Sequence, residues 1–385
     1  MSKHDETIAC SAGINCDPAQ GAVVPPLYLS ANYSFAGFGE KRAFDYSRSG
    51  NPTRSLLADA IAELERGAGA VVTSSGMSAV DLVLSVLPAN ALVIAPHDCY
   101  GGTWRLFDAR ARKGAIRVRF VDQNDAAAVA AALADEPALL WIETPSNPLM
   151  RIVDVAALAA RAHAAGARVA VDNTFLSPAL QKPIELGADF VVHSTTKYLN
   201  GHSDVVGGAV VAKHAADVEQ LVWWANCTGV TGAPFDAWLT LRGLRTLNVR
   251  IAQQTESAGR LAHWLEAHPH VGKVHYPGLP SHAGHEIARR QQSGFGAMLS
   301  FELPGADART FLAGLQRFTL AESLGGIESL IAHPASMTHA AMSAEARAQA
   351  GIGDCLFRLS VGLEHIDDLI ADLDHALAGA ARQAA

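Results

Sequence analysis

Residues 190–198 read Phe190-Val191-Val192-His193-Ser194-Thr195-Thr196-Lys197-Tyr198, an apolar run that passes directly into three hydroxyl side chains and a lysine. A short apolar run of this kind is typical of a strand that is buried on both faces of a sheet. Further runs of the same kind alternate with alanine-rich stretches of helical period between about residues 70 and 210, at 91–95, 118–121, 138–143, 168–172 and 209–211. The alternation predicts an α/β fold in which helices cover a parallel sheet.

Several of the predicted strands end at a polar side chain. Glu143, Asp172 and Ser194 each close an apolar run. In open α/β sheets, ligands bind beyond the carboxyl ends of the strands. We therefore expect these three side chains to lie where a site is built.

The chain is long enough for two domains and an additional arm. Its 385 residues exceed the roughly 250–300 at which a single hydrophobic core stops growing. The first sixty residues are rich in Pro, Gly, Asn and Tyr, and a segment of this kind is poorly tied down in a monomer. We expect an N-terminal arm that contacts a neighbouring subunit over 1–60, a large cofactor-binding domain over 61–250 and a smaller α+β domain over 251–385. Elements expected in the last domain are helices at 258–267 and 365–377 and strands at 297–302, 318–321 and 355–359.

Composition and charge argue against several classes of function. The 30 Lys and Arg residues are scattered and are outnumbered by 38 Asp and Glu, so nucleic acid is not an expected partner. No apolar segment approaches the roughly 20 residues that a membrane-spanning helix needs. The five cysteines form no CxxC pair and are interpreted as reduced thiols of a cytoplasmic protein. The cluster His97-Asp98-Cys99 lacks a second ligand group at metal-binding spacing, so a loop is favoured over a metal site.

Three segments carry candidate chemistry, and each also has an ordinary structural interpretation. Lys197 follows a strand, where a lysine is usually a solvated charge. Asp172 can cap the next turn. Thr73–Val80 places hydroxyl residues and Gly76 at a helix start, where capping is common, although backbone N–H groups there can also cradle a phosphate. No GxGxxG follows a strand, which argues against a dinucleotide-binding oxidoreductase.

Taken together, the three segments match the needs of pyridoxal phosphate. The cofactor requires a phosphate cradle, a carboxylate that keeps the pyridine nitrogen protonated, and a lysine that forms a Schiff base. The chain supplies them in the order found in the aspartate-aminotransferase-like class. This agreement favours a pyridoxal-phosphate enzyme over three unrelated structural features.

Over nearly its whole length the chain resembles the Cys/Met-metabolism family of pyridoxal-phosphate enzymes, and most closely the family's γ-replacing synthases. The signature around the lysine spans Asp189 to Asp204, and further family-like blocks lie at 46–53, 95–103, 143–148 and 322–326. The resemblance implies the aspartate-aminotransferase-like fold, known as fold type I, with a mostly parallel sheet in the large domain.

The resemblance also implies roles for individual cofactor-site residues. Lys197 is expected to hold the cofactor and to move the substrate's Cα proton, and Asp172 to pair with the pyridine nitrogen. The phosphate is expected to be held by Gly76, Met77, Ser194 and Thr196 of the same subunit and by Tyr46 and Arg48 of a neighbour. Tyr100 is expected to stack on the ring and relay a proton, with Asn147 beside the ring hydroxyl. Sites shared in this way imply dimers, which the family pairs into homotetramers.

Substrate-binding roles follow from the same resemblance. Arg358 is expected to clamp the substrate α-carboxylate with help from Ser323, although a surface arginine is the alternative for that position. Arg105 matches the position that binds the distal carboxylate of a succinyl ester. Where close synthase relatives carry two consecutive arginines, this chain has Arg48 followed by Ser49. That departure puts the succinyl ester in doubt and leaves an acetyl ester open.

The implied activity is replacement of succinate in O-succinyl-L-homoserine by L-cysteine, which gives L-cystathionine in transsulfuration and methionine biosynthesis. The alternative is γ-elimination of cystathionine to cysteine, 2-oxobutyrate and ammonia, or both reactions in one site. Glu322 occurs in both kinds of enzyme, whereas Asn226 and Asp45 are synthase-like. A non-catalytic protein that keeps only the fold is a further alternative, and the joint presence of Lys197 and Asp172 argues against it.

Overall fold

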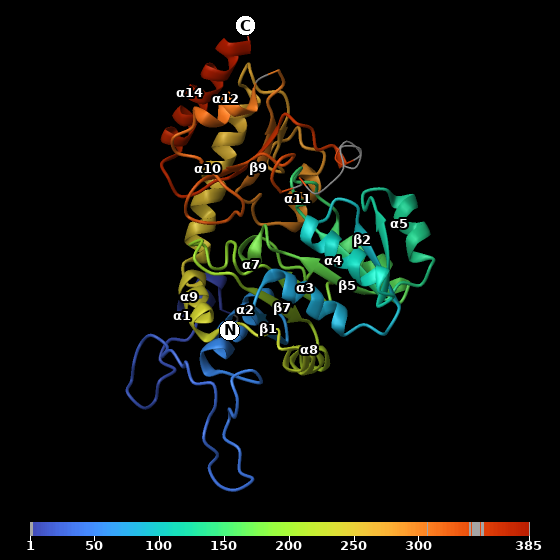
Figure 1. Cartoon of the computed structure of the whole chain (residues 1–385), viewed down its shortest axis with the longest axis vertical. Coiled ribbons are helices and arrows are strands. Elements are labelled where there is room, and N and C mark those ends of the chain that lie inside the picture. Colours follow the sequence, from blue (N-terminus) through green and yellow to red (C-terminus); the bar gives the residue numbers. More distant parts are fainter. Residues whose placement is uncertain (1–2, 306, 339, 341–346, 348–349, 385) are drawn as a thin grey trace. The chain divides into compact units, whose positions relative to one another are not determined.

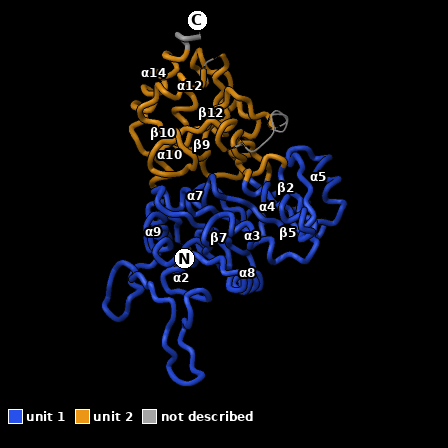
Figure 2. Tube along the Cα trace, in the orientation of Figure 1, with its two compact units in different colours: residues 1–96, 102–143, 155–248 blue, residues 97–101, 144–154, 249–385 orange. Residues whose placement is uncertain are grey.

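The computed structural model describes residues 3–305, 307–338, 340, 347 and 350–384. The chain divides into two compact units, coloured separately in Figure 2. Unit 1 contains residues 1–96, 102–143 and 155–248, and unit 2 contains residues 97–101, 144–154 and 249–385.

Unit 1 is built on a seven-stranded sheet of order β1-β7-β6-β5-β4-β2-β3. Strands β2 to β6 run parallel to their sheet neighbours within this group, as the alternating pattern predicted. The strands are β1 Gly69–Thr73, β2 Ala91–Pro96, β3 Ile116–Val121, β4 Leu139–Glu143, β5 Arg168–Asp172, β6 Phe190–His193 and β7 Gly208–Ala212.

Strand β7 departs from the prediction because it runs antiparallel to both of its neighbours. A parallel pair needs a crossover connection, usually a helix. Residues 194–207, which connect β6 to β7, form turns and coil instead of a helix. The chain therefore turns back, and the sheet is mostly parallel.

Helices bury both faces of this sheet. On one face α3, α4 and α8 share a core with Val93, Trp141 and Phe190, while residues such as Val171 and Val191 point to the opposite face, onto which α2 and α6 pack. The helices of this part of the chain are α1 Asp5–Ser11, α2 Pro52–Glu65, α3 Gly76–Ser85, α4 Gly101–Arg112, α5 Ala126–Leu133, α6 Val155–Ala164, α7 Ser177–Leu180, α8 Ala215–Thr228 and α9 Pro234–Leu244 (Figure 1).

Unit 2 contains a five-stranded sheet of order β10-β11-β12-β9-β8. The strands predicted at 297–302, 318–321 and 355–359 are confirmed as β9 Met298–Glu302, β10 Thr319–Leu320 and β12 Leu356–Ser360. Strands β8 Val274–His275 and β11 Leu330–Ala332 escaped prediction because two or three residues show no periodicity. The helices are α10 Leu247–Glu266, α11 His285–Gln291, α12 Ala308–Ala313 and α14 Ile366–Ala384.

Residues 12–51, between α1 and α2, form turns and coil with two isolated β-bridges, Asn32 to Tyr46 and Gly37 to Glu40. Apolar side chains stand out from this segment: Phe38 is fully exposed, and Leu29 and Val23 are 67% and 61% exposed. Helix α1, only seven residues long, was not predicted. Within the described residues, we find no helix with the length and apolar character required to span a bilayer.

Candidate active site

The carboxyl ends of three neighbouring strands bring the predicted polar residues to one edge of the sheet in unit 1. Strands β4 and β5 pair Glu143 with Asp172, and β5 and β6 pair Asp172 with Val192. Ser194 follows directly after β6. Glu143, Asp172 and Ser194 therefore lie at the same edge of the sheet.

The start of α3 forms a close-fitting cradle against Ser194. Ser75 is the N-cap, and its hydroxyl accepts the Ser78 N–H at 3.1 Å. A Cβ added at Gly76 would lie only 2.8 Å from the Cβ and 3.0 Å from the Cα of Ser194, closer than side chains normally approach. Met77 follows in the first turn and packs against the core of the unit. Glycine thus lets the start of a helix, where backbone N–H groups can bind an anion, meet the hydroxyl segment after β6.

The hydroxyl segment after β6 is itself fixed by hydrogen bonds. The Thr196 hydroxyl accepts the Gly207 N–H at 3.0 Å and lies 3.2 Å from the Gly207 carbonyl oxygen. The Lys197 N–H donates to the Ser194 carbonyl at 3.2 Å, and the Lys197 carbonyl accepts from Gly201 at 2.8 Å. Both turns that flank Lys197 are therefore held by backbone bonds.

Asp172 is a partly buried carboxyl with local hydrogen-bond donors. Its Oδ1 accepts the Thr174 N–H at 3.0 Å, and the Thr174 hydroxyl accepts the Ser194 N–H at 2.9 Å, so Thr174 links the two cofactor candidates. Burial raises the pKa of Asp172, while the hydrogen bonds from Thr174 and the charge of His193 oppose that rise. A cationic partner, such as a protonated pyridine nitrogen, would lower that pKa and favour the carboxylate.

The donor set in unit 1 fits pyridoxal phosphate. A helix start and hydroxyl groups suit the phosphate, Asp172 suits the ring nitrogen, and Lys197 directly follows Thr196, the last phosphate candidate after β6. Among the residues that the structure describes, no three His, Cys, Asp or Glu side chains gather as a metal site would require.

Unit 2 brings together three further candidates around Arg358 of β12. Arg358 is only 3% exposed, so the surface alternative for this residue is wrong. One guanidinium nitrogen donates to Asn147 Oδ1 at 2.9 Å and the other to the Ser323 carbonyl at 2.8 Å. Ser323 holds a φ of +84°, a left-handed conformation that a non-glycine residue adopts at a cost of roughly 1–3 kcal/mol. The arrangement fixes the plane of a five-donor group suited to a carboxylate.

The ring-stacking candidate Tyr100 and two of the substrate candidates are more exposed. Tyr100, immediately before α4, is 45% exposed. Arg105 lies exposed on α4, and Glu322 lies exposed immediately before Ser323. Exposure leaves these side chains accessible to a ligand or to another chain.

The arm places its candidates in contact with one another. The Arg48 guanidinium donates to the side-chain and main-chain oxygens of Asn226 at 2.5 and 2.7 Å and lies 5.4 Å from the centre of the Tyr46 ring. Asp45 accepts from Lys41 and from the Ser49 hydroxyl at 2.7 and 2.9 Å, and these bonds lower the pKa of Asp45 to about 2. Ser49, which departs from the family pattern, is thus bonded to a synthase-like residue.

The sequence reasoning missed Glu65, a fully buried carboxyl at the end of α2. Its Oε1 lies 2.6 Å from His193 Nε2 and accepts from Asn173 at 2.8 Å. A signal was present: Leu57, Ile61 and Glu65 recur every four residues, so Glu65 shares the buried face of the helix. A carboxyl at such a position needs partners, and both partners adjoin a predicted cofactor residue.

Comparisons with known proteins identify the family of the chain. The family described as Cys/Met metabolism PLP-dependent enzyme matches residues 6–378. The chain is 57% identical over 383 residues to cystathionine γ-synthase of Escherichia coli, covering 99% of each protein. It matches a crystal structure of cystathionine γ-synthase from Xanthomonas oryzae in complex with cystathionine with a TM-score of 0.98 and 59% identity, covering 99% of this chain and 100% of that one. A cystathionine γ-lyase from Micromonospora echinospora matches with a TM-score of 0.95 and 45% identity, covering 98% and 100%. The chain belongs to the Cys/Met-metabolism family of PLP-dependent enzymes.

Proposed function

We propose that the protein catalyses the cystathionine γ-synthase reaction, in which the thiol of L-cysteine replaces succinate at Cγ of O-succinyl-L-homoserine and gives L-cystathionine. The observation that carries the proposal is the full-length similarity to the Xanthomonas oryzae synthase structure that contains cystathionine. The similarity to the Escherichia coli synthase supports it independently.

In this proposal the residues of unit 1 hold the cofactor. The start of α3 at Gly76 and Met77 binds the phosphate together with the hydroxyls of Ser194 and Thr196, and Asp172 pairs with the ring nitrogen. When bound, pyridoxal phosphate supplies an aldehyde for amines and a ring that withdraws electrons from the substrate's Cα. The Asp172 carboxylate keeps that ring protonated, so it sustains the electron withdrawal.

Lys197 and Tyr100 move protons in the proposed reaction. The Lys197 amine holds the cofactor in the resting enzyme and, once the substrate amine displaces it, takes the proton from Cα and returns it at the end. Tyr100 stacks on the ring, and its hydroxyl relays a proton. Both groups therefore act directly at the reacting atoms.

Arg358 binds the substrate α-carboxylate in the proposed complex. The bonds to Asn147 and Ser323 fix the guanidinium plane before substrate arrives, which reduces the ordering that binding requires. Asn147 lies beside the ring hydroxyl, and Ser323 orients the same end of the substrate. Glu322, Asn226 and Asp45 complete the proposed substrate site.

The distal carboxylate of the ester is assigned to Arg105. Ser49 contributes no positive charge and instead donates its hydroxyl to Asp45. If Arg105 alone binds the succinyl carboxylate, O-succinyl-L-homoserine is used in preference to the O-acetyl ester. Arg105→Ala then removes the preference, whereas Arg112→Ala on the same helix, where Arg112 pairs with Asp108 at the surface, leaves it intact.

We further propose a cytoplasmic homotetramer built from dimers that share active sites. The arm exposes apolar side chains along with Tyr46, which is 48% exposed and contacts Arg48. A second subunit would cover this apolar surface, and Tyr46 and Arg48 would reach the neighbour's phosphate. All five cysteines are free thiols, as is usual in a reducing compartment.

The deciding experiment supplies the purified protein with O-succinyl-L-homoserine, with and without L-cysteine, and follows cystathionine and 2-oxobutyrate by mass spectrometry. Cystathionine as the main product with cysteine present supports the proposal, and Lys197→Ala abolishes the reaction. If the ester is ignored while added cystathionine yields 2-oxobutyrate, γ-elimination replaces it. Absence of both turnover and cofactor absorbance would make the chain a non-catalytic member of its family.

A further inference from the structure

A buried carboxyl–imidazole pair lies at the end of α2, and the proposed mechanism uses neither of its groups. The Glu65 and His193 side chains are both fully buried, and Glu65 Oε1 lies 2.6 Å from His193 Nε2. Glu65 Oε2 and His193 Nδ1 have no hydrogen-bond partner within the described part of the chain.

Asn173 connects this pair to strand β5. The Asn173 side-chain amide donates to Glu65 Oε1 at 2.8 Å and to the Gln181 carbonyl at 2.9 Å, and its oxygen accepts from Gln181 Nε2 at 3.1 Å. The Asn173 N–H donates to the Val192 carbonyl at 3.0 Å. One carboxylate oxygen of Glu65 therefore joins α2 to the residues that follow β5 and close β6.

Both partners of Glu65 are chain neighbours of cofactor residues. Asn173 directly follows Asp172, and His193 directly precedes Ser194. Because β5 and β6 are paired at Asp172 and Val192, a shift of either strand end would move both the ring-nitrogen carboxylate and the phosphate hydroxyl.

Stability alone does not account for a pair of this kind. Removing two polar groups from water carries a large desolvation penalty, and replacing a buried ion pair by apolar residues is often neutral or stabilising. The pair also leaves two buried polar atoms without a partner in the described residues. The contribution of the pair therefore lies in how it positions the ends of β5 and β6.

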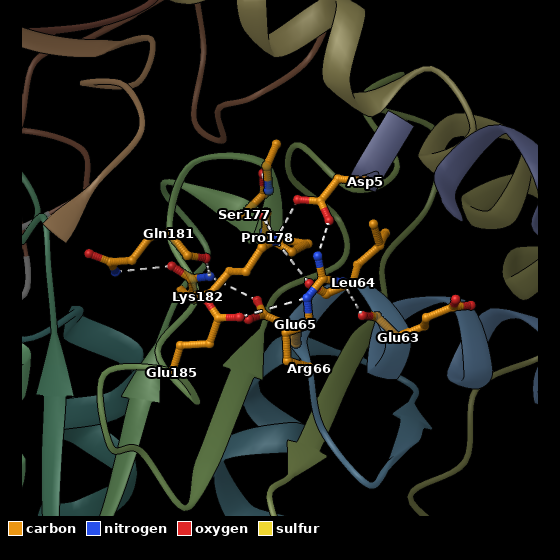
Figure 3. Close-up of polar contacts among 12 residues, drawn as sticks. Asp5, Glu63, Leu64, Glu65, Arg66, Ser177, Pro178, Gln181, Lys182 and Glu185 are labelled. Carbon is orange, nitrogen blue, oxygen red and sulfur yellow. Dashed lines mark hydrogen bonds and ion pairs between the residues drawn. The ribbon is translucent and has the colours of Figure 1, made fainter. Parts of the chain in front are cut away.

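Lys182 adds further contacts between the end of α2 and the loop that contains Asn173. Lys182 Nζ donates to the carbonyls of Leu64 and Pro178 at 3.0 and 2.7 Å and pairs with Asp5 at 2.6 Å, as Figure 3 shows. Leu64 directly precedes Glu65, so residues 173–182 are bound to the end of α2 at two successive positions, by Asn173 at Glu65 and by Lys182 at Leu64. These contacts hold the backbone next to Glu65 in place.

We propose that Glu65 and His193 are positioning residues that fix the strand ends carrying Asp172 and Ser194 and so set the affinity and orientation of the bound cofactor. The inference rests on the cofactor site proposed above. It assigns a role in cofactor binding to two residues that act through their neighbours Asp172 and Ser194 and do not contact the cofactor themselves.

The test compares Glu65→Gln, His193→Gln and the double variant with a matched control. Asp189→Asn is that control, because Asp189 accepts from His163 at 2.9 Å and from the Val169 N–H at 2.8 Å at the opposite ends of the same two strands. For each protein we would measure the dissociation constant of pyridoxal phosphate, the circular dichroism of the bound chromophore and the thermal unfolding midpoint.

Each single variant is expected to weaken cofactor binding about tenfold to a hundredfold, the scale known for outer-shell partners of metal ligands, and to change the circular dichroism. The double variant is expected to be no weaker than the weaker single one, because the two residues act as a unit. Asp189→Asn should leave affinity and circular dichroism unchanged.

Equal cofactor affinity in Glu65→Gln and wild type would overturn the inference, as would an equal loss in Asp189→Asn. If both pair variants failed to fold while Asp189→Asn folded, the pair would be assigned to stability and the inference would fall. Failure of the wild-type protein to bind pyridoxal phosphate would instead refute the proposed cofactor site, so the two failures are distinguishable.

Discussion

Gly76→Ala provides the sharpest test of the phosphate cradle. The substitution adds one methyl group to the start of α3, facing the backbone and side chain of Ser194. Gly76 has no positive φ, so alanine meets no backbone strain there. Any effect must come from the approach of α3 to the hydroxyl segment.

The magnitude follows from the distances. The new Cβ would lie 2.8 Å from the Ser194 Cβ and 3.0 Å from its Cα, whereas carbon atoms in contact prefer roughly 3.5–4.0 Å. The helix start or Ser194 must therefore move by roughly half an ångström to 1 Å. Overpacking of this kind costs about 1–3 kcal/mol, which corresponds to a loss of about 5- to 150-fold if it falls on the cofactor complex.

The assay is titration of the apoprotein with pyridoxal phosphate, followed by absorbance, beside thermal unfolding. Gly379→Ala is the control, because Gly379 lies within α14 and its added Cβ would meet nothing within 4 Å. That variant should bind the cofactor normally and gain roughly 0.5–1 kcal/mol of stability. Normal cofactor affinity in a folded Gly76→Ala protein would show that the contact with Ser194 does not shape the phosphate site.

Three further outcomes are expected. Arg358→Lys should raise KM for the ester by about tenfold or more with little change in cofactor affinity, because lysine cannot bond Asn147, Ser323 and a carboxylate in one plane. An unchanged KM in steady-state assays would contradict binding of the α-carboxylate by Arg358. Burial raises the pKa of Asp172, so between the ordinary carboxyl pKa and this raised pKa the folded apoprotein binds more protons than the unfolded chain, and its stability falls as pH rises. The Asp172→Asn apoprotein should therefore unfold at a higher temperature than wild type at neutral pH while losing activity. A lower unfolding midpoint would contradict this direction of the shift. Burial lowers the pKa of His282 from 6.5 to about 4, so the stability of the folded protein falls as pH drops through that range. In urea titrations, the His282→Gln variant should lose less stability between pH 7 and 4.5 than the wild-type protein loses.

The sequence carried much of the fold because buried strands leave continuous apolar runs. The predicted strand at 168–172 coincides with β5, and its polar end, Asp172, stands where the pattern placed it. The direction of β7 was not predictable from its own residues, since Gly208–Ala212 is apolar in either orientation and the connection from β6 determines which one forms.

The site was predictable to the extent that its residues adjoin those elements or stand in a family motif. The motif suggested a role for Arg358, yet its hydrogen-bond partners, Asn147 and Ser323, lie 211 and 35 residues away in the chain. Glu65 went unnoticed because a glutamate near a helix end is usually solvated, and its partners come from two other elements. Contacts between distant segments are set by tertiary packing, which local patterns do not encode.

The short helix α1 has a practical consequence for handling the protein. Asp5 pairs with both Lys182 and Arg66 at 2.6 Å, so helix α1 is anchored to the loop that follows Asp172. A cleavable purification tag at this end, or a protease that trims it, acts on that loop as well as on the terminus. A preparation shortened by half a dozen residues lacks Asp5 and its ion pairs, and its cofactor retention is not comparable with that of the full chain. Intact mass should be recorded before any such comparison.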